Sequence, residues 1–258
     1  MPDLMTRLDE LTQRVTNRLL WALPGETIHV PTDVPVVSFT FDDVPDTALT
    51  AGAEILERYD ARGTFYIAGG LVGTVEPERR LIDAQGCRAL AARGHEVACH
   101  TYAHPNIRHL SRRALGADLD RNADALAAIM PGFVPSNFAF PYNAGSFSAR
   151  PELARRFRTA RGGGEGINRG VTDRTFLKGV AIQQPDESAL ALTAMIDDLI
   201  ENPGWLVFYT HDVADRPTPY GTTPAVFETL VAHARRRGCA LLTVDEALDG
   251  MAPESLRS

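Results

Sequence analysis

Three clusters of polar side chains in this sequence could carry catalytic chemistry: the adjacent Asp42 and Asp43, the pair His100 and His104, and His211. Two imidazoles four residues apart can bind one metal ion from the same helical turn, and a nearby carboxylate would supply a third ligand. Two histidines and one carboxylate leave coordination positions free for water and substrate. That arrangement is typical of a catalytic metal site rather than a structural one.

The two adjacent aspartates can divide the work between them. One would bind the metal, and the other would stay off it and take a proton from a water molecule. His211 would donate a proton to the leaving group. Each cluster alone is a weak signal, because aspartates are common in turns after strands and paired histidines are often solvated. Together they are the components of metal-assisted amide hydrolysis.

Alternating strands and helices must position these clusters. The expected strands cover residues 36–41, 64–67, 96–99, 137–140, 158–160, 180–182, 206–209 and 240–242. The expected helices cover residues 48–59, a segment ending at 92, and residues 111–130, 187–201 and 224–237. Repeated alternation predicts a mainly parallel sheet, and about eight short strands favour a distorted barrel over an open sheet. Each cluster follows a strand, which is where parallel α/β folds build their sites.

Composition excludes several classes of protein. The 258 residues include 26 basic and 33 acidic residues, a net charge of -7 without a basic stripe, so we expect no nucleic-acid partner. Three cysteines form no disulfide framework and fit a reducing compartment. No apolar run approaches the roughly 20 residues that cross a bilayer, and the first residues lack the apolar segment of a signal peptide. We therefore expect a cytoplasmic protein without a transmembrane segment.

An amphipathic helix is expected before the first strand. Its apolar residues recur every three or four positions on one face, and Pro24-Gly25 ends it. They are Leu4, Leu8, Leu11, Val15 and Leu19. We favour packing of this face on the main domain, with a homodimer contact or a membrane-surface helix as alternatives. The predicted organisation is a helical extension over residues 1–30 and one domain over residues 31–258.

Five strings in the sequence resemble the polysaccharide deacetylases with the NodB homology domain, also called carbohydrate esterase family 4. The strings are SFTFDD (38–43), GTFYIAGG (63–70), GHEVACHTYAHPN (94–106), FAFPYN (138–143) and FYTHD (208–212). The resemblance implies a distorted (β/α) barrel. It also implies Asp42 as the catalytic base, His211 as the general acid, and a metal held by Asp43, His100 and His104. The backbone N–H of Tyr142 would donate to the oxyanion.

The sequence departs from the family pattern at three places. Val44 and Pro45 stand where the family has Gly, Ala139 stands where it has an Arg that braces the base, and its Trp-containing string is replaced by a Gly-rich segment over residues 161–173. We expect residues 161–170 to form an active-site loop that needs close backbone approach or positive φ. Arg161 is the predicted replacement brace, since a planar fork can hold a carboxylate with two hydrogen bonds. The alternative is that Arg161 is solvated or binds a substrate phosphate.

These features lead to one main hypothesis and two alternatives. The main hypothesis is a metal-dependent hydrolase that removes an N-acetyl or N-formyl group from an amino sugar. Zinc is the expected metal, and cobalt, nickel or iron would also fit. Resemblance to a bacterial subgroup associated with surface-polysaccharide biosynthesis suggests a nucleotide- or lipid-linked precursor as the substrate. The alternatives are a non-haem iron oxygenase, which also uses two histidines and one carboxylate, and a non-catalytic sugar-binding relative.

Overall fold

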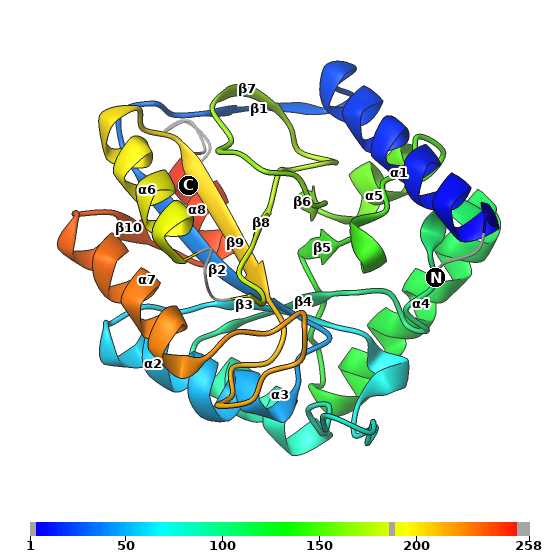
Figure 1. The fold of residues 1–258 in the computed structure, drawn as a ribbon. Coiled ribbons are helices and arrows are strands. Elements are labelled where there is room, and N and C mark those ends of the chain that lie inside the picture. The colour runs from blue at the N-terminus through cyan, green and yellow to red at the C-terminus, as the bar shows by residue number, and fades with distance from the viewer. Residues whose placement is uncertain (1–3, 186–188, 252–258) are drawn as a thin grey trace.

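A curled parallel sheet, surrounded by helices, forms the centre of the computed structural model, which describes residues 4–185 and 189–251 (Figure 1). Along the sheet the strand order is β6 (Thr159–Arg161), β5 (Asn137–Ala139), β4 (Glu96–Cys99), β3 (Thr64–Ile67), β2 (Val36–Asp42), β9 (Trp205–Thr210) and β8 (Val180–Ala181). Strand β10 (Ala240–Leu241) also pairs with β2, and all of these pairs are parallel.

The segment around Leu177 links the two edges of this sheet. The Leu177 N–H donates to Ala160 O in β6, and the Gly162 N–H donates to Leu177 O, both at 2.9 Å. A few residues later, β8 pairs with β9. The sheet therefore curls round into a distorted barrel, and the predicted fold class is confirmed.

Helices follow or connect most of these strands. They are α2 (Glu54–Arg58), α3 (Ala84–Ala92), α4 (Arg112–Ile129), α5 (Arg150–Arg156), α6 (Ala189–Glu201), α7 (Pro224–Arg236) and α8 (Val244–Met251). The Ser111 hydroxyl accepts from the Ala114 N–H and caps α4, as its sequence predicts. The helix expected over residues 48–59 begins as a π-helix, Ala48–Ala53, before α2. Residue 187, the expected start of α6, lies outside the described residues. Sequence patterns did not reveal the antiparallel pair of β1 (Thr27–Val30) and β7 (Gly170–Asp173), or helices α5 and α8.

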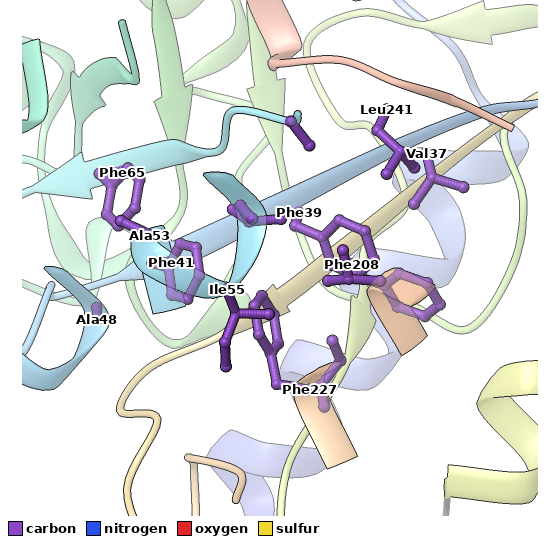
Figure 2. Packing of buried hydrophobic residues seen from close by; sticks show 14 of the residues in the cluster. Val37, Phe39, Phe41, Ala48, Ala53, Ile55, Phe65, Phe208, Phe227 and Leu241 are labelled. Atoms are coloured by element: carbon purple, nitrogen blue, oxygen red, sulfur yellow. The ribbon is translucent and has the colours of Figure 1, made fainter. Parts of the chain in front are cut away.

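Aromatic side chains fill the space between the sheet and the helices next to β2 (Figure 2). Phe41 of β2 stacks on Phe65 of β3 with ring centroids 4.5 Å apart, and Phe39 packs on Phe208 and Phe227 at 5.5 and 5.4 Å. Side chains alternate along a strand, so Asp42 points to the opposite side of the sheet from these rings. The aromatic core thereby directs Asp42 into the barrel.

Helix α1 (Leu4–Ala22) is present as expected, but the predicted packing through its leucine face is wrong. Its buried side is formed by Asn17 and Leu20, and Trp21 stacks on Phe176 at 5.3 Å. The leucine face is turned outward, with Leu11 58% exposed. The other face is preferred because Asn17 hydrogen-bonds backbone groups of the barrel that would otherwise lack partners. Within the described ranges, no helix has the length and apolar character that crossing a bilayer requires.

We predict that Phe208→Ala lowers the free energy of unfolding by about 3–5 kcal/mol, because it leaves a buried cavity beside the Phe39 ring, on which Phe208 stacks. Phe147→Ala is the matched control, since Phe147 is 41% exposed, and it should cost less than about 1 kcal/mol. Urea unfolding followed by circular dichroism measures both. Equal losses for the two variants would contradict the assignment of Phe208 to the core.

Candidate active site

The three polar clusters of the sequence meet at one end of the barrel. Asp42 is the last residue of β2, His100 directly follows β4, and His211 directly follows β9. Their side chains line a cleft of about 430 Å³. The other residues that line it are Asp43, Leu71, Glu76, Arg79, His104, Tyr142, Asn143, Gln183, Tyr209 and Tyr220.

Asp43, His100 and His104 form a cluster whose ligand atoms all lie within 4.8 Å of one another. Asp43 Oδ1 lies 3.2 Å from His104 Nε2 and 3.7 Å from His100 Nε2. Ligand atoms of a tetrahedral site with bonds of about 2.0–2.1 Å are roughly 3.3 Å apart. Asp43 Oδ1 is buried and has no hydrogen-bond partner among the described residues. An orphaned carboxylate oxygen that faces two ring nitrogens fits a divalent cation.

The protonation states of this cluster also suit a metal. His100 Nδ1 lies 2.9 Å from Ala139 O, and donation to this carbonyl leaves the Nε2 lone pair free. Burial lowers the pKa of His100 to about 4, so its ring is neutral at pH 7. Burial would raise the pKa of Asp43, but the neighbouring imidazoles and the Arg79 guanidinium bring this pKa down to about 2. Neutral imidazole and ionised carboxylate are the forms that bind metals.

Strained backbone is concentrated at the cleft. Of the seven non-glycine residues with positive φ in the described chain, all but Asp60 lie in the segments that carry the site. They are Asp43, Val44, Thr101, His104, Tyr142 and Asn143, with φ between 51° and 65°. Val44, a β-branched residue at φ 57°, is the most unfavourable of them, and it stands where the family has Gly. Such strain persists only where the surrounding structure enforces it, and it is frequent at functional sites.

Arg161 forms a buried ion pair with Asp42. Its Nη2 donates to both carboxylate oxygens, at 2.6 and 2.5 Å, and the Arg161 side chain has no exposed surface. The predicted contact is therefore present, and the alternative of a solvated Arg161 is wrong. The predicted fork geometry differs, because the second arm, Nη1, donates instead to Asn143 Oδ1 and Gly162 O. The rings of Tyr66 and Tyr209 flank the guanidinium at 5.5 and 4.5 Å.

The position of Arg161 follows from strand register. Ala139 of β5, where the family has its arginine, pairs with Arg161 of β6. Paired residues of neighbouring parallel strands lie at the same level and on the same face of the sheet. A guanidinium on β6 therefore reaches the region of the barrel to which residue 139 also points.

The remainder of the Gly-rich segment does not line the cleft. Gly163 packs closely against Asn143, and Gly164 against Trp21, so the expected close approach of the backbone is present. The expectation that this segment forms an active-site loop is wrong, because residues 162–170 do not line the cleft.

His211 lies on the loop after β9 and lines the same cleft as Asp42. Its Nε2 is 3.9 Å from Asp43 Oδ2, and its ring is 5.6 Å from that of Tyr220. Its Nδ1 is buried and has no hydrogen-bond partner within the described chain. His211 thus lies beside the cluster of Asp43, His100 and His104, and its ring contacts that of Tyr220.

The turn that contains Tyr142 is held by the N-terminal helix. Tyr142 adopts φ 58° and ψ 13°, and its ring lies 4.7 Å from that of His104. Gln13 Nε2 donates to Tyr142 O at 2.7 Å, and Asn17 Nδ2 donates to Asn143 O at 2.9 Å. The Gly145 N–H in turn donates to Asn17 Oδ1 at 3.0 Å. Helix α1 is therefore part of the scaffold of the cleft.

Sequence reasoning missed several residues of the site. Arg79 Nη2 donates to Asp43 Oδ2 at 2.9 Å, while its Nε donates to Glu76. Asn143 Nδ2 donates to the Tyr209 hydroxyl at 3.0 Å. Asn143 belongs to the string FAFPYN and Tyr209 to the string FYTHD. Their closeness in sequence to Tyr142 and His211 could have indicated them as site residues. Arg79 lies in the loop between β3 and α3, where no pattern marks it.

Comparisons with known proteins agree with this architecture. The chain is 26% identical over 234 residues to a chitin deacetylase of Colletotrichum lindemuthianum, covering 90% of this chain and 86% of that protein. It is 30% identical over 107 residues to a chitooligosaccharide deacetylase of Bradyrhizobium sp. (strain ANU 289), covering 41% of this chain and 45% of the relative.

Among solved structures, a family 4 acetyl xylan esterase from Clostridium thermocellum in complex with a cobalt ion superposes with a TM-score of 0.58. It is 22% identical, and the match covers 86% of this chain and 96% of the other, which shows a shared fold. The sequence profile described as polysaccharide deacetylase matches residues 29–156, the part that contributes both aspartates and the histidine pair. The chain belongs to the polysaccharide deacetylase family.

Proposed function

We propose that this protein is a metal-dependent carbohydrate deacetylase that removes an N-acetyl or N-formyl group from an amino sugar. The observation that carries the proposal is the different surroundings of the two adjacent carboxylates. Asp43 presents an orphaned oxygen to His100 and His104, whereas Asp42 is ion-paired with Arg161. The relatives named as chitin and chitooligosaccharide deacetylases support a carbohydrate substrate.

Asp43, His100 and His104 would hold one divalent ion. Zinc is proposed first, because two imidazoles, one carboxylate and open positions suit it, and cobalt, nickel or iron would also fit. When bound, the ion would polarise the substrate carbonyl and make the attacking water more acidic. Arg79, which contacts the other oxygen of Asp43, would orient this ligand.

The other residues would move protons and stabilise charge. Asp42 takes a proton from the attacking water, and Arg161 keeps its carboxylate oriented toward the cleft. The backbone N–H of Tyr142 donates to the oxygen of the tetrahedral species, where negative charge develops. His211 gives a proton to the departing nitrogen. The C–N bond breaks, and the products are a free amine and acetate or formate.

The substrate that we propose is a nucleotide- or lipid-linked precursor of a surface polysaccharide. The cleft volume is within the range of small-ligand sites, so one sugar with its acyl group can enter. A cytoplasmic location and a domain boundary at residue 30 stay predictions. The proposal is tested by incubating metal-loaded protein with nucleotide- and lipid-linked N-acyl sugars and measuring the loss of acyl mass. Turnover of 2-oxoglutarate without acyl loss would instead favour the iron oxygenase, and binding without either reaction the non-catalytic relative.

We predict that His100→Ala binds less than one tenth of the divalent metal bound by the unchanged protein, since one of three ligands is lost. Metal analysis after gel filtration measures the occupancy. His109→Ala is the matched control, because His109 is exposed and outside the cluster. Full occupancy in the His100 variant, with its circular dichroism spectrum unchanged, would exclude the assigned ligand set.

For the base, we predict that Asp42→Asn keeps its metal but loses about 10²–10⁴-fold in kcat, the usual contribution of proton transfer. The asparagine oxygen can still accept one hydrogen bond from Arg161, and circular dichroism checks that the variant is folded. Asp43→Asn is the comparison variant and should lose metal instead. If Asp42→Asn empties the site while Asp43→Asn does not, the two aspartates have exchanged roles.

For the brace, Arg161→Lys should lower kcat at least tenfold and leave KM within about twofold. A lysine ammonium cannot reach Asp42 and Asn143 in the fixed geometry of a guanidinium. Arg158→Lys is the control, since Arg158 pairs with Asp245 and Asp249 at the surface. An effect confined to KM would show that Arg161 recognises substrate rather than positions the base.

A further inference from the structure

The outer face of α1 carries a continuous apolar stripe, formed by Leu8, Leu11, Val15, Leu19 and, directly after the helix, Leu23. Each of these side chains is 46–58% exposed. Their spacing of three or four residues places them on one side, over a length of about 22 Å at 1.5 Å per residue. Single exposed leucines are ordinary, but a contiguous exposed row marks an interaction surface.

Three arginines line one edge of this stripe. Arg7, Arg14 and Arg18 each directly precede a residue of the stripe. Because successive residues of a helix are rotated by about 100°, all three lie along the same edge of the stripe. All three are exposed, and none forms an ion pair within the described part of the chain. Of the two acids on the helix, Asp9 is paired with Arg108, and Glu10, which directly precedes Leu11, lies on the same edge as the three arginines and leaves that edge with a net charge of +2. An apolar face with an arginine edge is typical of helices that lie in a membrane interface.

The position of α1 connects this surface to the cleft. The side of α1 opposite the stripe holds the turn of Tyr142 and Asn143 through Gln13 and Asn17, and Tyr142 lines the cleft. Figure 1 shows α1 along the periphery of the molecule, outside α5 and α4. A flat surface that contacts the stripe would therefore lie about one helix diameter, roughly 10 Å, from the turn of Tyr142.

Charge favours a lipid surface over a second copy of the chain. In an antiparallel pair with two-fold symmetry, each edge of the stripe faces the same edge of the other helix. These edges, each with three arginines against the single Glu10, would then lie together and repel each other. Anionic headgroups would instead neutralise these charges while the leucines enter the upper acyl region.

We propose that the outer face of α1 docks this protein on anionic lipid bilayers. The docking itself depends only on α1. Its use, which is to present a lipid-linked sugar to the cleft, rests on the proposed function.

The test is co-sedimentation of the full chain with vesicles of equimolar phosphatidylcholine and phosphatidylglycerol, or of phosphatidylcholine alone. We expect at least tenfold stronger partitioning into the anionic vesicles, weakened by salt. The double variant Leu11→Glu/Val15→Glu should lose at least tenfold. Leu190→Glu/Val134→Glu is the matched control, because it adds the same charge at two exposed apolar positions elsewhere, and it should bind like the unchanged protein.

Three results would overturn the proposal. They are no binding to either vesicle, equal losses in both double variants, and a dimer in light scattering that only the α1 variant dissociates. Hydrolysis of a water-soluble N-acetyl sugar, which should be unchanged in the α1 variant, separates this proposal from the proposed function. If no acyl sugar is cleaved but the α1 face still controls vesicle binding, only the proposed function fails.

Discussion

The buried ion pair between Arg161 and Asp42 is the interaction on which the candidate site depends. Removing two charges from water is costly, and the cost is offset only when further hydrogen bonds and charges compensate. Here Asn143, Gly162 O and the faces of Tyr66 and Tyr209 complete the surroundings of the guanidinium. The same Asn143 is fixed through its carbonyl by Asn17 of α1. One network thus joins four strands (β2, β3, β6 and β9), the turn of Tyr142 and the N-terminal helix.

Two adjacent aspartates can act differently only if the backbone separates them. Asp42 ends the extended strand β2 and points into the barrel toward Arg161, whereas Asp43 takes φ 58° and turns its carboxylate to His100 and His104. Val44 also has a positive φ, which is unfavourable for a β-branched residue. Burial of its side chain and a hydrogen bond from the Ile82 N–H to the Val44 carbonyl oxygen stabilise this conformation. The strain at this turn is the structural basis for assigning one carboxylate to the metal and the other to proton transfer.

The sequence predicted the parts of this arrangement that depend on strand ends and strand order. Buried apolar runs placed Asp42, His100 and His211 at one end of a parallel sheet, and Arg161 was expected directly after a strand next to that of Ala139. The pairing of Arg161 with Ala139 itself comes from the structure. It did not predict Asn143 or Arg79 as partners, because those contacts depend on loop conformations. It also assigned the wrong face of α1 to the interior. Apolar periodicity identifies a face but not what covers it, and here Asn17 and Leu20 decide the packing.

The central claim is that Asp43, and not Asp42, belongs to the metal centre. The most direct test is a crystal structure of the zinc-loaded protein with anomalous data collected at the zinc edge. We predict one peak, coordinated by Asp43 Oδ1, His100 Nε2 and His104 Nε2, with Asp42 still hydrogen-bonded to Arg161. A peak that is coordinated by Asp42, with Arg161 displaced from it, would exclude this assignment.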